Sequence, residues 1–210
     1  DSAYSGGVDS QVILDAFAKV APEKVVAFHI NHGISDNAST WEYFCKNTCK
    51  SLGVEFHVAH FQLKDQSNLE DKARVARYGA FAELVTSPTC ALVTAHHLDD
   101  QAETFFLNLM RGSGLDGLSA MPETKPFADG FHVRPFLSIS KEQITQYAVS
   151  ECLDWVEDES NKDVVYDRNF IRNEVMPLLK TRWAHAANNI GASVSPVSYT
   201  HLTLPTSDLV

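Results

Sequence analysis

Several features that commonly assign a sequence to a class of protein are missing here. No segment approaches the roughly 18 consecutive apolar residues of a membrane-spanning helix, and no signal peptide opens the chain. The four cysteines include no Cys-x-x-Cys pair, which argues against a redox or metal motif. Cys45 and Cys49, four positions apart, instead predict one semi-buried stripe of a helix. We therefore expect a cytoplasmic protein without membrane contact.

Basic residues are also scarce. The 210 residues include 17 Lys and Arg against 27 Asp and Glu, which gives a formal net charge of −10. That sign disfavours broad contact with the phosphate backbone of a nucleic acid. Residues 160–193 differ, because they carry 5 basic and 3 acidic side chains. A polyanionic substrate would therefore have to be held locally.

What is present is the composition of a globular protein, with 44% hydrophobic residues and short apolar segments that alternate with longer helical patterns. Strands are predicted at residues 25–30, 55–60 and 91–95, because these segments are too short and too β-branched for helices. The alternating order predicts an α/β fold, a doubly wound parallel sheet with helices on both faces. Ligands of such sheets lie beyond the carboxyl ends of the strands.

The sequence predicts one domain, or one domain with a small appendage, over residues 1–193, in which residues 140–193 form a helical C-terminal part. Its first strand would be truncated, since only Ala3 and Tyr4 directly precede a glycine turn. Residues 194–210 contain no basic residue, no periodicity, six Ser or Thr and two prolines. They are predicted to be a disordered or artefactual tail.

The glycine turn is Ser5-Gly6-Gly7-Val8-Asp9-Ser10, between this short strand and an apolar helix. Two glycines permit a tight turn that gathers backbone amides, and the following helix adds its positive end, which together favour a phosphate-binding nest. Ser5 and Ser10 can add hydroxyl donors, and Asp9 is a candidate Mg²⁺ ligand. A plain strand-to-helix turn is the alternative. No Walker lysine is present, so γ-phosphate transfer of the P-loop type is not favoured.

Three carboxylates follow the predicted strand 91–95, in the segment His96-His97-Leu98-Asp99-Asp100-Gln101-Ala102-Glu103. On a helix beginning near Asp99, residues three and four apart share one face. Acids in a first turn can simply complement the helix dipole, but several together repel one another unless a cation is present. Mg²⁺ or the amino group of a substrate could be that cation. Zinc is not favoured, because neither His96 nor His97 has partners at zinc-ligand spacing.

Arginines provide candidate sites for phosphate or RNA. Arg168 and Arg172 are four apart on a predicted helix capped by Asp167, where they could bind phosphate or pair with nearby acids. Arg111 and Gly112 end the helix that carries the acidic segment, and Gly112 could be a mobile loop, a ligand contact or an ordinary helix cap. Arg77 lies on a predicted helix, where it could bind phosphate or simply belong to the solvent-exposed face of that helix.

The SGGVDS turn resembles the pyrophosphate-loop, or N-type ATP pyrophosphatase, superfamily. The other motifs resemble the tRNA(Ile)-lysidine synthase family in the same order, from about Tyr4 to about Ser193. They are HINHGIS at 29–35, LEDKARVARYGAF at 69–81, TAHHLDDQAETFFLNLMRGSGLDGLSAM at 94–121, RPFLSIS at 134–140 and WVEDESNKDVVYDRNFIRNEVMPLL at 155–179. The glycine turn alone is shared by many ATP-cleaving enzymes, whereas the series of motifs is specific.

This resemblance implies an adenine-nucleotide α-hydrolase-like fold and a ligase that uses ATP, Mg²⁺ and free L-lysine. Its substrate would be tRNA(Ile) with a CAU anticodon, whose wobble cytidine becomes lysidine through an adenylated intermediate. Members of the family carry further C-terminal domains that help to bind tRNA. The alternatives are a related pyrophosphate-loop tRNA thiolase, disfavoured by the missing Cys-x-x-Cys, and a non-catalytic nucleotide-binding fragment. The oligomeric state is left open, with a homodimer as one option.

The resemblance also implies roles for individual residues. It assigns nucleotide binding to Ser5, Gly6, Gly7, Val8, Asp9, Ser10, Asn31, His32, Arg111 and Gly112. Catalytic roles fall to Asp9, Arg77, Asp100 and Arg172. Substrate binding falls to Glu103, His96 and Arg168, with Glu103 recognising the ammonium of lysine. The Mg²⁺ ligands would be Asp9 and Asp100.

Overall fold

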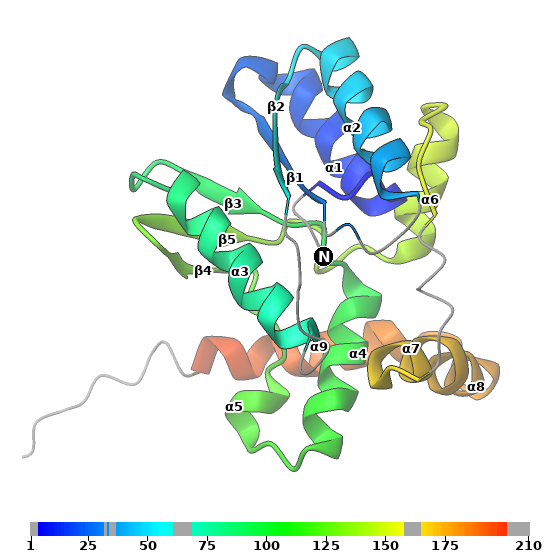
Figure 1. Ribbon diagram of the computed structural model, residues 1–210. Coiled ribbons are helices and arrows are strands. Elements are labelled where there is room, and N and C mark those ends of the chain that lie inside the picture. Colours follow the sequence, from blue (N-terminus) through cyan, green and yellow to red (C-terminus); the bar gives the residue numbers. More distant parts are fainter. Residues whose placement is uncertain (1–3, 32, 34–36, 61–68, 158–164, 201–210) are drawn as a thin grey trace, which may run out of the picture. The chain divides into compact units, whose positions relative to one another are not determined.

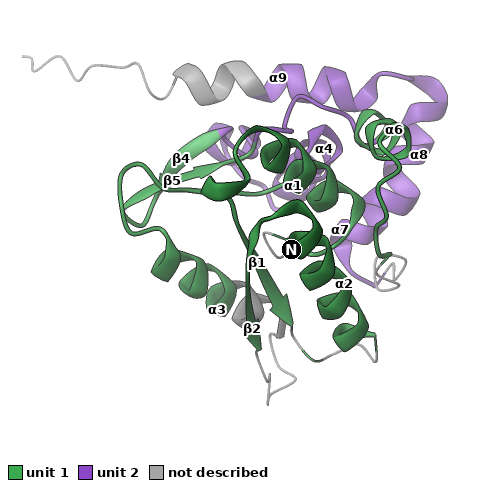
Figure 2. Ribbon diagram, turned by 90° about the horizontal axis from the view of Figure 1, so that it is seen from above, with its two compact units in different colours: residues 1–95, 124–134, 142–157 green, residues 96–123, 135–141, 158–210 purple. Residues whose placement is uncertain are grey.

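The computed structural model describes residues 4–31, 33, 37–60, 69–157 and 165–200, with the side chains of residues 69–74 and 195–200 excepted. Where the sequence predicts one domain over residues 1–193, the contacts divide the chain into two compact units, which Figure 2 colours separately. Unit 1 comprises residues 1–95, 124–134 and 142–157, and unit 2 comprises residues 96–123, 135–141 and 158–210. Each unit is thus assembled from several separate stretches of the chain.

Unit 1 contains all the strands that the structure describes. Strand β1 (Val26–Asn31) pairs in parallel with β2 (Glu55–His60), and β3 (Ala91–Val93) pairs in parallel with β5 (Gly130–Val133). The predicted strands at 25–30, 55–60 and 91–95 are therefore confirmed, each to within two residues of its observed ends. The α/β class with parallel strands is confirmed as well.

One strand pair was not predicted. Strand β4 (Thr124–Phe127) runs antiparallel to β5, in the order β3-β5-β4. Proline lacks an amide hydrogen for the strand ladder, so Pro126 hides the strand in the sequence; it is tolerated because β4 lies at an edge. At the hairpin, a Cβ on Gly130 would clash with the carbonyl oxygen of Cys90, so only glycine fits there.

Helices cover both faces of β1, as the doubly wound prediction requires. Ala27 packs in one apolar cluster with residues of α1 (Val8–Val20) and α2 (Ala38–Leu52). Ile30 points to the opposite face and packs in a second cluster with Phe81 of α3 (Leu69–Leu84). Figures 1 and 2 show α3 on one side of β1 and β2, with α1 and α2 on the other. The remaining elements of unit 1 are the short η1 (Pro22–Lys24) and most of α6 (Lys141–Ser150).

No strand precedes the glycine turn among the described residues, in line with the short first segment. The backbone amide of Tyr4 donates to the carbonyl oxygen of Phe28 at 3.1 Å, which places Tyr4 alongside β1. Its side chain is 3% exposed and its hydroxyl donates to Oε1 of Gln11 at 2.6 Å. Tyr4 therefore anchors the chain immediately before the turn.

Unit 2 is built from helices in its described part. They are α4 (Leu98–Met110), α5 (Leu115–Leu118), α7 (Asp167–Phe170), the π-helical η3 (Ile171–Val175), α8 (Met176–Arg182) and α9 (Ala186–Thr200). Leu98 and Ala102 of α4 form the core together with Ile171, Met176 and Ala187. None of the described helices in either unit is both long enough and apolar enough to cross a membrane.

Helix α9 changes one expectation about the chain's end. It continues through residue 193 to Thr200, so residues 194–200 are helical rather than a disordered tail, while residues 201–210 lie outside the described part. Ala187, Ile190 and Val194 recur at helical spacing, and Val194 is only 2% exposed. A Cβ on Gly191 would lie 2.5 Å from Cδ1 of Leu98, which shows how closely α9 packs on α4.

Candidate nucleotide and acidic sites

The glycine turn in unit 1 has the backbone shape of an anion nest. Gly6 has a φ of +83°, in the left-handed region, and α1 begins at Val8 directly after Gly7. A Cβ on Gly6 would lie 2.8 Å from Sγ of Cys45 and 3.1 Å from Cγ2 of Val156. Position 6 therefore requires glycine both for its backbone angle and for the space around it. The first turn of α1, which includes Asp9, presents amides that have no acceptor within the helix.

The two serines of the turn close it. Ser10 Oγ donates to the carbonyl oxygen of Gly7 at 2.9 Å, and Ser5 Oγ accepts from the amide of Gly7 at 3.3 Å. The two hydroxyl oxygens are themselves 3.2 Å apart. The backbone amide of Val156 also donates to the carbonyl oxygen of Gly6 at 3.0 Å. These contacts hold the turn in shape, so the hydroxyls predicted to meet phosphate also brace the nest.

The cysteines near this turn are buried thiols. Cys45 and Cys49 lie in α2 on one stripe, as predicted, and at 0% exposure both are fully rather than partly buried. Burial raises the pKa of each thiol to about 12, so both stay protonated at neutral pH. They support the nest by packing rather than by reacting.

Asn31, predicted to line the nucleotide pocket, lies at the carboxyl end of β1. Its Nδ2 donates to Oε2 of Glu42 at 2.7 Å, and its Oδ1 accepts from the amide of Gly33 at 2.9 Å. His32, assigned to the same pocket, lies outside the described residues. Glu42 follows Ser39 at the spacing of a capping box, which predicts a helix start, but α2 begins at Ala38 and the Glu42 carboxylate reaches Asn31 instead.

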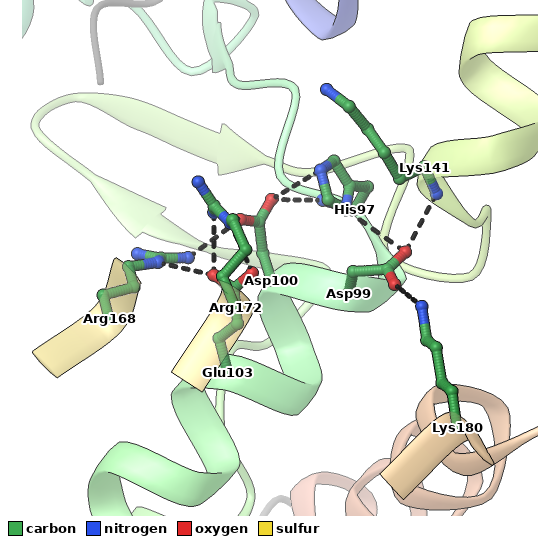
Figure 3. A network of polar contacts seen from close by, with 8 residues as sticks. All are labelled: His97, Asp99, Asp100, Glu103, Lys141, Arg168, Arg172 and Lys180. Carbon is green, nitrogen blue, oxygen red and sulfur yellow. Dashed lines mark hydrogen bonds and ion pairs between the residues drawn. The ribbon is translucent and has the colours of Figure 1, made fainter. Parts of the chain in front are cut away.

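The acidic segment in unit 2 forms the start of α4. His97 is the residue before the first turn, and its backbone amide donates to Oδ2 of Asp100 at 2.9 Å. Asp100 and Glu103 are 8% and 1% exposed. Figure 3 shows both carboxylates turned toward Arg168 and Arg172, and Asp99 turned toward Lys141 and Lys180 instead. Of the two pairs expected to share a face, Asp100 and Glu103 share their arginine partners, whereas Asp99 pairs with lysines instead of joining Glu103.

Two guanidinium groups neutralise these two buried acids. Oδ1 of Asp100 accepts from Nη2 of Arg168 at 2.9 Å and from Nη2 of Arg172 at 3.2 Å. Glu103 accepts from Nε of Arg168 at 2.8 Å, and from Nε and Nη2 of Arg172 at 2.7 and 2.8 Å. The sequence predicts a positive charge beside these acids, and Arg168 and Arg172 of the chain itself provide it.

The charges of this cluster shift its pKa values in opposite directions. Burial raises the pKa of Asp100, but the electrostatic interactions with His97 and Arg168 outweigh burial and lower that pKa to about 2. Burial lowers the pKa of the Arg168 guanidinium, but the negative charges of Asp100 and Glu103 raise it by more, so the net change is a rise. Both partners are thus ionised at neutral pH.

Acid should weaken this cluster over a defined range. A folded pKa of about 2 for Asp100 lies below the value of about 4 for an unfolded Asp, so its stabilisation is complete above about pH 4 and is lost as pH falls to about 2. We expect a loss of about 2 kcal/mol in the free energy of unfolding across this range, measured by urea unfolding at fixed pH. The Asp100→Asn variant should show a shallower fall. Equal slopes for variant and parent would contradict the assignment.

The arginines reach the cluster from an unusual helix. Arg168 lies in α7 and Arg172 lies in the π-helical segment that follows. Tyr166 rather than the predicted Asp167 is the residue that precedes α7, a shift of one position. π-Helical turns are rare and occur frequently at functional sites. The π-helical geometry therefore favours a functional role for Arg168 and Arg172 over an ordinary solvent-exposed ion pair.

The other predicted residues are distributed between the units. Arg77 is half-buried in α3 of unit 1, whereas Arg111 is exposed at the end of α4 in unit 2 and His96 is half-buried just before α4. Gly112 has a φ of +69° and its amide donates to the carbonyl oxygen of Leu109 at 3.0 Å, which is the geometry of a helix cap.

The proposed metal ligands are similarly divided, since Asp9 belongs to unit 1 and Asp100 to unit 2. Within the described ranges, no group of three or more His, Cys, Asp or Glu side chains is arranged to hold a metal ion.

Comparison with known proteins identifies relatives of this chain. The family model of the PP-loop domain matches residues 2–179. The tRNA(Ile)-lysidine synthase of Actinobacillus pleuropneumoniae serotype 3 is 47% identical over 190 residues, which cover 90% of this chain and 45% of that protein. The enzyme of the same name from Legionella pneumophila strain Lens is 43% identical over 194 residues, covering 91% and 45%. The chain therefore spans about half the length of the curated relatives it matches.

A solved structure shows a similar fold. The U34-tRNA thiolase NcsA from Methanococcus maripaludis, with its [4Fe-4S] cluster, superposes with a TM-score of 0.77 over 96% of this chain and 70% of that chain. The two sequences are 18% identical, so this likeness concerns the fold alone.

Proposed function

Because the chain belongs to the PP-loop domain family, we propose that unit 1 binds ATP with its phosphates on the nest formed by residues 5–10. The observation that carries this proposal is Gly6, whose positive φ and lack of a Cβ are both needed where the turn meets Cys45. The nest amides and the start of α1 would hold the departing pyrophosphate, whose charge they match.

We propose further that the activity is that of the lysidine synthases, which the relatives' names and the series of motifs support. The C2 carbonyl oxygen of the wobble cytidine in the CAU anticodon of tRNA(Ile) would attack the α-phosphorus of ATP, and pyrophosphate would leave. The amine of free lysine would then add at C2, lose a proton and expel AMP. Adenylation is needed because a carbonyl oxygen is a poor leaving group, so the protein's main task is to orient the reacting groups.

Mg²⁺ would neutralise charge on the phosphates when bound. Asp9 fits a role as its ligand, because it is half-buried in the first turn of α1 beside the nest. Asp100 is already fully engaged: its oxygens accept from the His97 amide and from two guanidinium groups. Its metal role therefore requires that Arg168 or Arg172 move away first. Recognition of the lysine ammonium by Glu103 carries the same requirement.

Arg168 and Arg172 are proposed to have a different role from the two acids that they contact. Their described contacts to Asp100 and Glu103 use Nε and Nη2 of each guanidinium, which leaves the Nη1 edge of each group for an anion. We propose that these edges, with Arg77 and Arg111, approach phosphate groups of the nucleotide or the tRNA, and that His96 contacts the substrate. The acids would fix the orientation of the guanidinium groups.

Labelled lysine tests this function directly. The protein is incubated with ATP, Mg²⁺, ¹⁴C-lysine and an excess of CAU-anticodon tRNA, and radioactivity on the RNA and AMP release are measured. We expect both signals, and neither with a tRNA that lacks the cytidine at the wobble position. ATP binding without any label on the RNA would refute the ligase and leave a nucleotide-binding module.

The thiolase alternative is disfavoured by the cysteines. Sulfur transfer or cluster binding needs accessible thiolates, yet Cys45 and Cys49 are buried and protonated. The remaining two cysteines, Cys90 and Cys152, are far apart in sequence and form no Cys-x-x-Cys motif.

Asp9→Asn should retain the fold and reduce AMP release by about 100-fold, the scale of one preorganised electrostatic contact. The change removes the charge that would hold Mg²⁺ but keeps the size of the side chain. Asp116→Asn is the matched control, since Asp116 is an exposed acid in the first turn of α5 and has no assigned role. Near-normal AMP release by Asp9→Asn would remove its metal role.

A further inference from the structure

A segment from far along the chain packs against the phosphate nest. Residues 154–156, which we call the strap, follow α6 and belong to unit 1 together with the nest. The backbone amide of Val156 donates to the carbonyl oxygen of Gly6 at 3.0 Å, and its Cγ2 lies 3.1 Å from the position of a Cβ on Gly6. The strap thus touches the nest residue whose backbone angle requires glycine.

The hydrogen bond from Val156 sets the direction of one nest amide. The carbonyl group of Gly6 and the N–H of Gly7 belong to the same planar trans peptide, so they point in opposite directions. Because Val156 holds the carbonyl on the side of the strap, the N–H of Gly7 is turned to the other side, where Ser5 Oγ accepts from it at 3.3 Å. A shift of the strap would therefore rotate this peptide and misdirect the amide.

Gln11 ties the strap to α1. Its Nε2 donates to the carbonyl oxygen of Asp154 at 2.6 Å, and its Oε1 accepts from the hydroxyl of Tyr4 at 2.6 Å. The side chain is 5% exposed, so water cannot readily replace either bond. Burial raises the pKa of Tyr4, which keeps its hydroxyl protonated and able to donate. Gln11 therefore joins the chain before the nest, the helix after it and the strap beside it.

A second set of contacts joins α1 to α6 one turn further along α1. Oδ2 of Asp15 accepts from the hydroxyl of Tyr147 at 2.8 Å and lies 2.8 Å from Nζ of Lys19. Nζ of Lys19 is in turn 2.6 Å from Oε2 of Glu151. These contacts connect the two helices through residues outside the strap and the nest. Removing one of them would loosen α6 on α1 without releasing residues 154–156.

We infer that Gln11 is a positioning residue for pyrophosphate binding, because it holds the strap where Val156 aims the Gly7 amide of the nest. The inference rests on the proposed ATP site. The amide nitrogen and oxygen of Gln11 are turned to Asp154 and Tyr4, so Gln11 acts on a ligand through the strap rather than by contact. A purely structural role predicts that its removal lowers stability and leaves pyrophosphate affinity unchanged.

Calorimetric titration with inorganic pyrophosphate separates these cases. Gln11→Met keeps the length of the side chain and removes both of its hydrogen bonds. We expect pyrophosphate affinity to fall about fivefold, the scale of one hydrogen bond. Amide hydrogen exchange gives a second, local measurement. The Val156 amide should exchange about fivefold faster in the variant, because its bond to Gly6 opens more often.

Tyr147→Phe is the matched control. It removes the hydrogen bond to Asp15 and so weakens the contact of α6 with α1, but it leaves the bonds of Gln11 in place. We expect a lower free energy of unfolding, with pyrophosphate affinity and Val156 exchange as in the parent. If Gln11→Met does not fold, the double variant Tyr4→Phe/Gln11→Met should show the same loss of affinity, because it also removes the hydroxyl that Gln11→Met leaves without its partner.

The remaining outcomes contradict the inference. Unchanged pyrophosphate affinity in Gln11→Met, or unchanged exchange of the Val156 amide, would overturn the positioning role and leave the ATP site in place. Equal losses of affinity in Gln11→Met and Tyr147→Phe would do the same, since they would indicate a general loosening of unit 1. A parent protein that binds no pyrophosphate would overturn the proposed nest itself, and the inference with it.

Discussion

Gly6→Ala is expected to weaken ATP binding at least tenfold and to lower the free energy of unfolding by about 2 to 3 kcal/mol. The added methyl group would lie 2.8 Å from Sγ of Cys45, in a buried site that cannot easily widen. The φ of +83° at this position is in addition strained for any residue with a Cβ. Calorimetric titration with ATP and urea unfolding measure the two effects separately.

Gly53→Ala is the matched control for Gly6→Ala. Gly53 ends α2 with a φ of +69°, but a Cβ added there would meet nothing within 4 Å, so only the backbone strain of about 1 kcal/mol is expected. Its ATP affinity should match the parent. Adding Cys45→Ala to Gly6→Ala should restore part of the lost ATP affinity, because it removes the clashing sulfur. If Gly6→Ala and Gly53→Ala behave alike, the steric argument for the nest is wrong.

Glu103→Ala should have the largest effect in unit 2, a loss of about 3 kcal/mol in the free energy of unfolding measured with urea. Its carboxylate is 2% exposed and accepts three hydrogen bonds from Arg168 and Arg172. Removing it leaves two guanidinium groups with Asp100 as their remaining acid. The arginine side chains are 28% and 35% exposed, so water offsets part of the loss and the effect stays at the lower end for buried pairs.

Asp99→Ala is the corresponding control. Asp99 lies one turn before Glu103 in α4, but its partner Lys180 is 45% exposed, so a loss of about 1 kcal/mol is expected. An equally small loss for Glu103→Ala would contradict the buried cluster.

Glu103→Gln then distinguishes two roles. If Glu103 orients arginines, the variant loses stability at unchanged lysine dependence, whereas binding of the lysine ammonium predicts a raised lysine requirement at nearly unchanged stability.

Much of the fold follows from local patterns in the sequence. Buried strands of a parallel sheet are short apolar runs, and the three predicted ones lie where β1, β2 and β3 are observed. The hairpin of β4 and β5 escaped prediction because Pro126 argues against a strand until its edge position is known. The helical segment 194–200 was missed because its apolar residues are spaced among serines.

The candidate sites were likewise predictable only where their residues are neighbours in the sequence. The nest at residues 5–10 was predictable, since its glycines, serines and helix start are neighbours in the sequence. The partners of Asp100 and Glu103 were not, because Arg168 and Arg172 follow 65 to 72 positions later and meet them only when α7 packs near α4. The same acids and arginines had each been assigned to external ligands. The contact of Glu42 with Asn31 was likewise not predictable, because the Ser39–Glu42 spacing indicates only a helix start and the contact depends on how α2 packs on β1.

The interleaved make-up of the two units bears on how the protein can be taken apart. Residues 96–123 and 135–141 of unit 2 are inserted between stretches of unit 1. The shortest continuous fragment that includes all of unit 1 therefore runs from residue 1 to 157 and carries both insertions with it. An isolated nucleotide-binding module would need artificial linkers in place of those insertions. Progressive shortening from the C-terminus would instead remove α9, then α8, η3 and α7, and with η3 and α7 the arginine counterions of Asp100 and Glu103, while both insertions stay in place.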